Sequence, residues 1–169
     1  MNTHNPLPGA VPSLHQLIEH QVARTPELEA LRFKGQSLSY AELDRRANQL
    51  AHYLRELGVG PDDIVGLYME RSLELVIALL AILKAGGAYL PIDTSYPAPR
   101  VQFLLDDAQV PVVLTQQHHA GKLDDFCGTV LPMDVCASFL AQYPGHAPEH
   151  LTQPGDLALR LQALEQRRE

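Results

Sequence analysis

The chain has 169 residues, of which 46% are hydrophobic and 20% charged, the proportions of an ordinary globular protein of single-domain size. Its formal net charge of −7, with no local cluster of lysine and arginine, argues against a nucleic-acid or acidic-membrane surface. The sequence shows neither a secretory signal nor an apolar run of the roughly 20 residues that a membrane span needs, so we expect a cytoplasmic protein.

A flexible lead-in and a helix are the first elements expected. Residues 1–12 contain three prolines, a glycine and few apolar side chains that could anchor them. Ser13 provides an N-cap for the following helix, which we expect to pack on its own domain and to end at Thr25-Pro26. The apolar stripe of this helix comprises Leu14, Leu17, Ile18 and Val22.

A hairpin and a second helix follow. The dipeptide Lys34-Gly35 separates two short apolar-rich segments, which predicts a β-hairpin with Gly35 at positive φ. Ser39 followed by Glu42 is a capping-box pattern, with each side chain bonding the other residue's backbone amide, and it marks a helix that ends at Gly58. The apolar face of that helix comprises Tyr40, Leu43, Ala47, Leu50, Ala51, Leu54 and Leu57.

The longest apolar segment lies near the middle of the chain. Residues 75–83 are apolar at every position, so a helix there would have to be buried on all sides. Lys84 places a cation in its last turn, where the helix dipole is negative, and Gly86 permits a C-cap at positive φ. Residues 88–92 predict a short buried strand, with Pro91 near its end or on an unpaired side because proline donates no ladder hydrogen bond.

Strands and helices alternate through this half of the chain. The expected elements are a strand at 64–68, a helix at 73–85, a strand at 88–92, a helix at 98–107, and strands at 111–115 and 129–131. Such alternation predicts right-handed βαβ crossovers and a parallel sheet. The expected fold class is therefore α/β, a mostly parallel sheet with flanking helices, preceded by a helix and a hairpin. Residues 143–154, rich in Pro, His and Gly, predict a surface loop.

Two motifs in this order carry a family resemblance. The segments LSYAEL, residues 38–43, and LKAGGAYLPID, residues 83–93, resemble the first and second core motifs of the adenylation domains of nonribosomal peptide synthetases, which are adenylate-forming ligases. The likeness covers residues 13–158, with Thr94 where family members often have proline. It implies ATP- and magnesium-dependent activation of an amino acid to an aminoacyl-adenylate, which is then loaded onto a carrier thiol.

The likeness stops before the catalytic motifs. A glycine-, serine- and threonine-rich phosphate loop should follow residues 155–158, but strong helix formers stand at 159–169. A frameshift, a truncation with a new tail and a gene-model boundary all fit this change. We therefore divide the chain into a lead-in, 1–12, a partial adenylation subdomain, 13–158, and a divergent helical tail, 159–169. No catalytic, cofactor-binding or metal-binding residue is assigned, and no cofactor is expected for this fragment.

Two functional hypotheses follow from the resemblance. The first is a truncated adenylation domain that is inactive alone, which leaves its status as an enzyme open. The alternative is a non-catalytic interaction or complementing module that docks on another synthetase chain, on remaining synthetase segments or on a neighbouring domain. A remnant without present function is a third, weaker hypothesis.

Other candidate chemistry is weaker still. The pairs Gly58/Gly60 and Gly86/Gly87 fit neither GxGxxG nor GxxxxGK[ST], and helix stops explain them better. The remaining candidates considered are His15 with His20, which are five residues apart, and Cys127 with Cys136, which lack zinc-type spacing and are expected to be free thiols.

Polar residues near predicted strand ends form the last group. His118-His119 would point in opposite directions on an extended chain, so a solvated loop is favoured over a metal site. Glu70-Arg71-Ser72 and Asp93 lie at the ends of predicted parallel strands, where ligands bind in open α/β sheets. A cap, a turn or an ion pair is nevertheless the favoured interpretation there.

Overall fold

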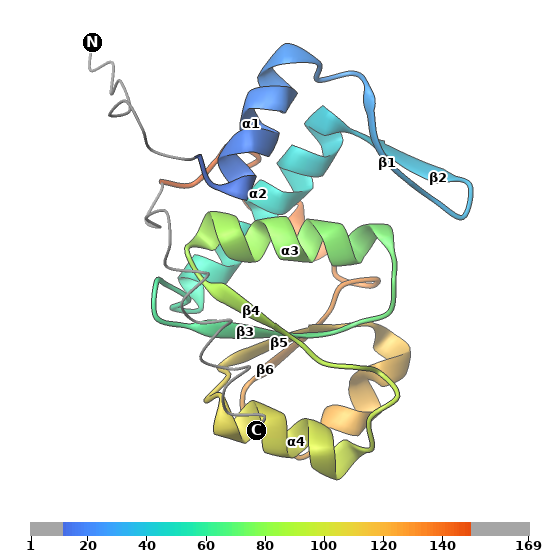
Figure 1. Cartoon of the computed structure of the whole chain (residues 1–169), viewed down its shortest axis with the longest axis vertical. Coiled ribbons are helices and arrows are strands. Elements are labelled where there is room, and N and C mark those ends of the chain that lie inside the picture. Colours follow the sequence, from blue (N-terminus) through green and yellow to red (C-terminus); the bar gives the residue numbers. More distant parts are fainter. Residues whose placement is uncertain (1–11, 150–169) are drawn as a thin grey trace.

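The computed structural model describes residues 12–149 (Figure 1). Its elements are α1 (Leu14–Arg24), β1 (Glu29–Phe33), β2 (Gln36–Ser39), α2 (Tyr40–Glu56), β3 (Ile64–Tyr68), α3 (Leu73–Ala85), β4 (Ala88–Pro91), α4 (Ala98–Asp107), β5 (Val112–Thr115), the 3-10 helix η1 (Gln117–Leu123), β6 (Thr129–Pro132) and α5 (Ala137–Leu140). The expected helix, hairpin and alternating elements are confirmed. The predicted tail, 159–169, and all but the last residue of the lead-in lie outside the described residues.

The larger sheet has four strands in the order β4-β3-β5-β6, and every neighbouring pair is parallel. Gly66 of β3 is in register with Leu90 on one side and Val113 on the other. Pro91 is the last residue of β4, an edge strand of this sheet, so its missing amide hydrogen costs no central ladder bond. The predicted parallel sheet and the predicted position of Pro91 are both confirmed.

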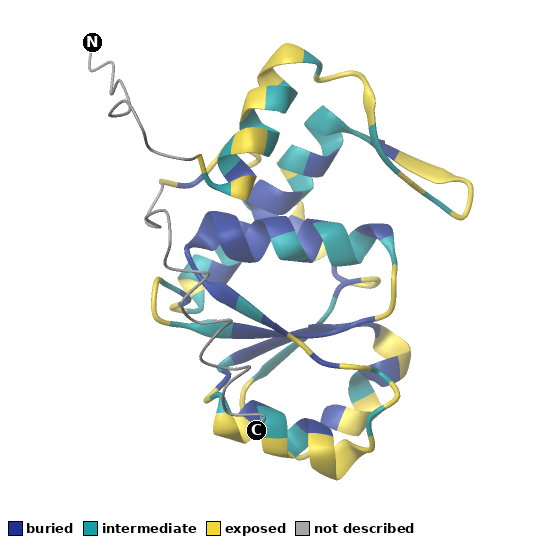
Figure 2. Ribbon diagram, in the orientation of Figure 1, coloured by how far each residue is buried: buried dark blue, intermediate teal, exposed yellow. Residues whose placement is uncertain are grey.

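Helices cover both faces of this sheet (Figure 1). Helix α3 lies on one face and α4 on the other. Helix α2 packs on the outer side of α3, and α1 lies beside both α2 and α3. Side chains of β3 alternate between the two faces of the sheet, as in any strand. Val65 and Leu67 belong to the hydrophobic cluster that includes α3, whereas Tyr68 belongs to the hydrophobic cluster that includes α4. Figure 2 shows the buried residues concentrated in the sheet and in α3.

The ends of α3 form as the sequence predicts. The Ser72 hydroxyl oxygen accepts the amide hydrogen of Leu75 at 3.1 Å, which caps the N-terminus. Gly86 ends the helix at φ 95°, a left-handed conformation that a side chain would strain. Between these caps, most of the α3 residues are buried, in agreement with their apolar character.

Lys84 stands in the last turn of α3, as expected, but its side chain also joins this helix to two others. Its side chain is fully buried, with Nζ 2.5 Å from Glu19 Oε1 of α1 and 2.8 Å from Asp44 Oδ1 of α2. The carbonyl oxygens at the end of α3 are instead met by Arg55 of α2, which donates to Lys84 and Ala85 at 3.2 and 3.3 Å. Lys84 thus ties α1 and α2 to α3, and Arg55 complements the helix dipole.

The hairpin agrees with expectation, and the N-terminus of α2 agrees in part. Lys34 and Gly35 have φ of 49° and 80°, as a tight hairpin turn requires. Ser39 Oγ accepts the Glu42 amide hydrogen at 3.2 Å, so half of the predicted capping box is present. The expectation that the Glu42 carboxylate reaches back to the Ser39 amide is wrong, because this carboxylate pairs with two arginine side chains in the next turn of the helix. These are Arg45 at 2.6 Å and Arg46 at 2.7 Å.

The segment after α5 lies along α2. Asn48 Nδ2 donates to the Gly145 carbonyl at 2.9 Å, and Gln49 Nε2 donates to the Tyr143 carbonyl at 3.3 Å. Residues 143–149 contain neither helix nor strand, as predicted for a loop, and residues 150–154 lie outside the described part. Of the helices between residues 12 and 149, none has the length and apolar character to cross a bilayer.

Replacing Lys84 tests the ion-paired junction of the helices. In Lys84→Ala, Glu19 and Asp44 lose their shared cation while staying largely buried, so the free energy of unfolding should fall by about 3–5 kcal/mol. Urea denaturation followed by circular dichroism measures this loss. The matched control, Lys122→Ala, removes an exposed lysine and should change stability by no more than about 0.5 kcal/mol. Equal midpoints for the two variants would contradict the structural role of Lys84.

Candidate functional site

The strand order separates two chain connections at the carboxyl edge of the sheet. The parallel strands β3 and β5 are neighbours, but the chain leaves them toward opposite faces of the sheet. Strand β3 leads into α3 on one face, and β5 leads into η1, which packs with α4 on the other face. Open α/β sheets bind ligands where the connections diverge in this way. The residues that follow these two strands, 69–72 and 116–119, are therefore the candidate site.

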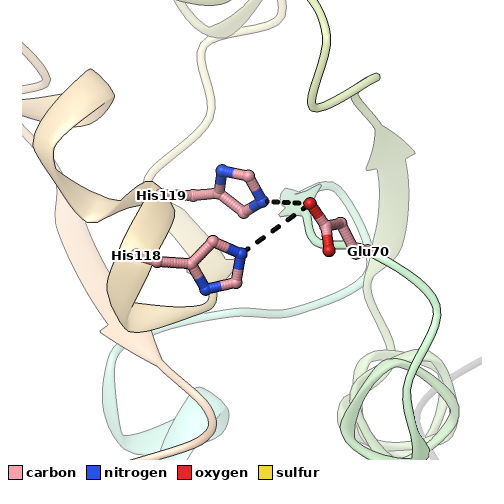
Figure 3. A group of neighbouring side chains, drawn as sticks. All are labelled: Glu70, His118 and His119. Atoms are coloured by element: carbon pink, nitrogen blue, oxygen red, sulfur yellow. Dashed lines mark hydrogen bonds and ion pairs between the residues drawn. The ribbon is translucent and has the colours of Figure 1, made fainter.

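A carboxylate and two imidazoles meet at this edge of the sheet (Figure 3). His119 Nε2 lies 3.0 Å from Glu70 Oε1, and His118 Nε2 lies 3.7 Å from the same oxygen. The two imidazole ring centroids are 4.0 Å apart. The hydrogen bond from His119 holds the pKa of the Glu70 carboxyl below its ordinary value, and the charge of His118 adds to this effect.

Glu70 is held in place through its backbone. Gln116 Oε1 accepts the Glu70 amide hydrogen at 2.9 Å, while Gln116 Nε2 lies 3.4 Å from both the Glu70 carbonyl and Ser72 Oγ. The Gln116 side chain therefore bridges the loop after β3 to the end of β5. Thr115 adds a second link, because its hydroxyl donates to the Tyr68 carbonyl at 2.7 Å.

The two histidines differ in exposure. His119 is buried, with its ring 5.3 Å from the ring of Tyr68, whereas the His118 side chain is 58% exposed. The start of their helix is fixed by Asp134, whose Oδ1 accepts the Gln117 amide hydrogen at 2.8 Å. One histidine is thus buried and the other is exposed to solvent, and both lie beside the same carboxylate.

The expectation that His118 and His119 diverge is wrong. They lie in η1 rather than on an extended chain, so the angle between successive side chains is about 120° instead of about 180°. Their carboxylate partner, Glu70, stands 49 residues before His119, which a search at helical spacing could not find. Only the topology indicates that these residues meet. Both segments follow parallel strands, and the carboxyl ends of parallel strands lie at one edge of the sheet.

Other residues singled out from the sequence do not join this group. The Asp93 carboxylate accepts the Ser95 amide hydrogen at 2.8 Å, a bond that lowers the pKa of Asp93, so the turn interpretation is confirmed. His15 is buried in α1 while His20 is exposed. The remaining assignments are an exposed Arg71, an exposed free Cys127, and a buried free Cys136 whose thiol pKa is raised by burial to about 11.

The described glycine pairs do not fit a phosphate group. The amides of Gly58 and Gly86 donate to carbonyls of the preceding helical turn at 2.9 and 3.1 Å. Those of Gly60 and Gly87 donate to the Asp63 carboxylate at 2.8 Å and to the Ile82 carbonyl at 3.0 Å. A phosphate cradle needs free amide hydrogens, so ATP cannot be held by these glycines as they stand.

Comparison with known proteins points to one family. Residues 18–156 match the family model described as AMP-binding enzyme. Tyrocidine synthase 3 of Brevibacillus parabrevis is 48% identical over 125 residues, which make up 74% of this chain and 2% of that protein.

Two solved structures share the fold. The nonribosomal peptide synthetase FmoA3, crystallised with α-methyl-L-serine-AMP, has a TM-score of 0.80 and 40% identity, covering 89% of this chain and 17% of that one. NpsA-ThdA of Klebsiella oxytoca, an artificially fused adenylation-PCP di-domain, has a TM-score of 0.76 at 22% identity. The match covers 87% of this chain and 27% of that one. The chain thus spans between 2% and 27% of the length of these three proteins.

Substituting Gln116 tests how the site is assembled. In Gln116→Ala, the loop after β3 loses its bridge to β5, so amide hydrogen exchange should accelerate from Glu70 to Leu75. Loss of these bonds should also lower the free energy of unfolding by about 1 kcal/mol. Gln117→Ala is the matched control, because the neighbouring Gln117 is exposed and uses its backbone amide for the contact with Asp134. Unchanged exchange in Gln116→Ala would rule out the bridge.

Proposed function

We propose that this chain, which belongs to the AMP-binding enzyme family, supplies the N-terminal sheet region of an amino-acid-activating adenylation domain of a nonribosomal peptide synthetase. The observation that carries this proposal is the fit of 89% of the chain, at a TM-score of 0.80 and 40% identity, to a synthetase crystallised with an aminoacyl-adenylate. In the proposed reaction an amino-acid carboxylate attacks the α-phosphate of ATP, and pyrophosphate leaves.

We infer that the 169 residues do not catalyse this reaction by themselves. Charge on the phosphates would have to be met by preorganised donors, and the amides of Gly58, Gly60, Gly86 and Gly87 already donate to protein oxygens. The cluster of Glu70, His118 and His119 does not suit Mg²⁺, which prefers an octahedral set of oxygen ligands. The contribution of this chain is structural: it forms a rigid parallel sheet whose carboxyl edge other synthetase segments complete.

A second candidate function is a complementing module that docks on another synthetase chain. Among the described residues, β4 and β6 each pair on one side only, which leaves backbone groups available for a further strand. Phe103 of α4 is also 65% exposed, although exposed single apolar residues are common. Size-exclusion chromatography separates the two candidates, since a monomer that recovers no synthetase partner would count against docking.

The isolated chain should show no amino-acid-dependent exchange of pyrophosphate into ATP. We expect exchange at the level of the buffer blank for each proteinogenic amino acid, because no described group holds the triphosphate. A full adenylation domain assayed alongside provides the positive control. Exchange at a rate comparable with that domain would overturn the proposal that the chain is inactive alone.

A chimera tests the scaffold role itself. Residues 18–156 would replace the corresponding segment of the FmoA3 synthetase, whose structure they match. If they supply the same sheet region, exchange with the host's own amino acid should persist within roughly tenfold, a change of about 1.4 kcal/mol in activation free energy. Deletion of the segment from the host is the control and should abolish exchange. A folded chimera with activity as low as the deletion would contradict the proposal.

A further inference from the structure

The cluster of Glu70, His118 and His119 brings together groups that ligate transition metals. One ligand atom from each residue lies within 4.8 Å of the other two. Zinc bonds of about 2.0–2.1 Å to nitrogen and oxygen place tetrahedral ligands about 3.3 Å apart. The distances of 3.0 and 3.7 Å from Glu70 Oε1 to the two imidazole nitrogens lie on either side of that value. Small rotations of exposed side chains would complete the geometry.

The surroundings hold the His119 ring and the backbone of Glu70 before any metal binds. Burial against Tyr68 restricts the His119 ring, and the bridge from Gln116 holds the backbone of Glu70. His118 needs no separate anchor because it precedes His119 in the same turn of η1. Preorganisation of this kind reduces the conformational entropy lost when a ligand binds.

We propose that Glu70, His118 and His119 bind a divalent cation of the zinc type, with its remaining coordination position open to solvent. Imidazole nitrogen together with carboxylate oxygen suits Zn²⁺, whereas Mg²⁺ and Ca²⁺ prefer oxygen ligands alone. The open position follows from exposure, since the side chains of Glu70 and His118 are 56% and 58% exposed. Three protein ligands with one open position also characterise zinc sites that take an exogenous ligand.

The proposed site would link two segments of the chain that leave the sheet toward opposite faces. Glu70 belongs to the link from β3 to α3, and the histidines belong to the link from β5 to β6. A bound cation would therefore hold these two segments together at the carboxyl edge of the sheet. This role is independent of the proposed adenylation function, because it requires only residues of this chain.

Isothermal titration calorimetry with zinc chloride tests the site on the full chain, free of affinity tags and treated with a chelator. We expect Glu70→Gln and His118→Ala each to weaken binding by roughly tenfold or more. Both substitutions alter exposed side chains, so circular dichroism should show an unchanged fold. Magnesium chloride, titrated in parallel, should give no comparable binding. The same tightness of zinc binding in wild type and Glu70→Gln would overturn the proposal.

Matched controls separate this site from other histidines and carboxylates. His52→Ala removes another imidazole that lies near a second one, with its ring centroid 5.2 Å from that of His146. Glu74→Gln removes a carboxylate in the first turn of α3. Neither should change zinc affinity, and equal losses in the controls would also overturn the assignment.

A spectroscopic readout is independent of both fold stability and activity. Co²⁺ in place of zinc should give visible d–d absorption from a site of low coordination number in the wild-type chain. That spectrum should be lost or shifted in Glu70→Gln and unchanged in His52→Ala. Identical spectra in all three proteins would place the cobalt elsewhere and refute the site.

Discussion

The burial of α3 on two sides is the constraint on which the other elements depend. Its apolar sequence allows it to lie between the parallel sheet and α2, so that each neighbour packs on a different face of one helix. Lys84, the cation that this helix buries, is neutralised by carboxylates from α1 and α2, and this fixes where those helices lie. A buried ion pair contributes little net stability but strongly disfavours arrangements that leave it unpaired.

The position of α3 also determines where chemistry can occur. Helix α3 takes the chain from β3 to β4, and the next strand, β5, pairs on the other side of β3, which leaves β4 at the edge of the sheet. The connections therefore diverge beside β3, and the loop carrying Glu70 faces the helix carrying His118 and His119. A single topological choice thus produces both the ligand-binding edge expected of this fold and the cluster of side chains within it.

Local features of the fold were predictable from sequence because they depend on neighbouring residues. Ser72 and Gly86 specify the limits of α3 through capping geometry, and the alternation of strands with helices specifies a parallel sheet. Strand order was not predictable, since several orders satisfy the same βαβ connections. The partners of Lys84 and the meeting of Glu70 with the histidines both depend on that order, so each was missed.

The chain belongs to the AMP-binding enzyme family, and the role that we propose for it there is that of a scaffold. A scaffold of this kind requires that the sheet and α3 form a cooperative core within the chain itself. Native-state hydrogen exchange on the 169-residue protein measures this most directly. The amides of α3 and β3 should exchange most slowly, through global unfolding only. If α3 amides exchanged as fast as those of the loop at 143–149, the chain would have no core of its own, and the account would be contradicted.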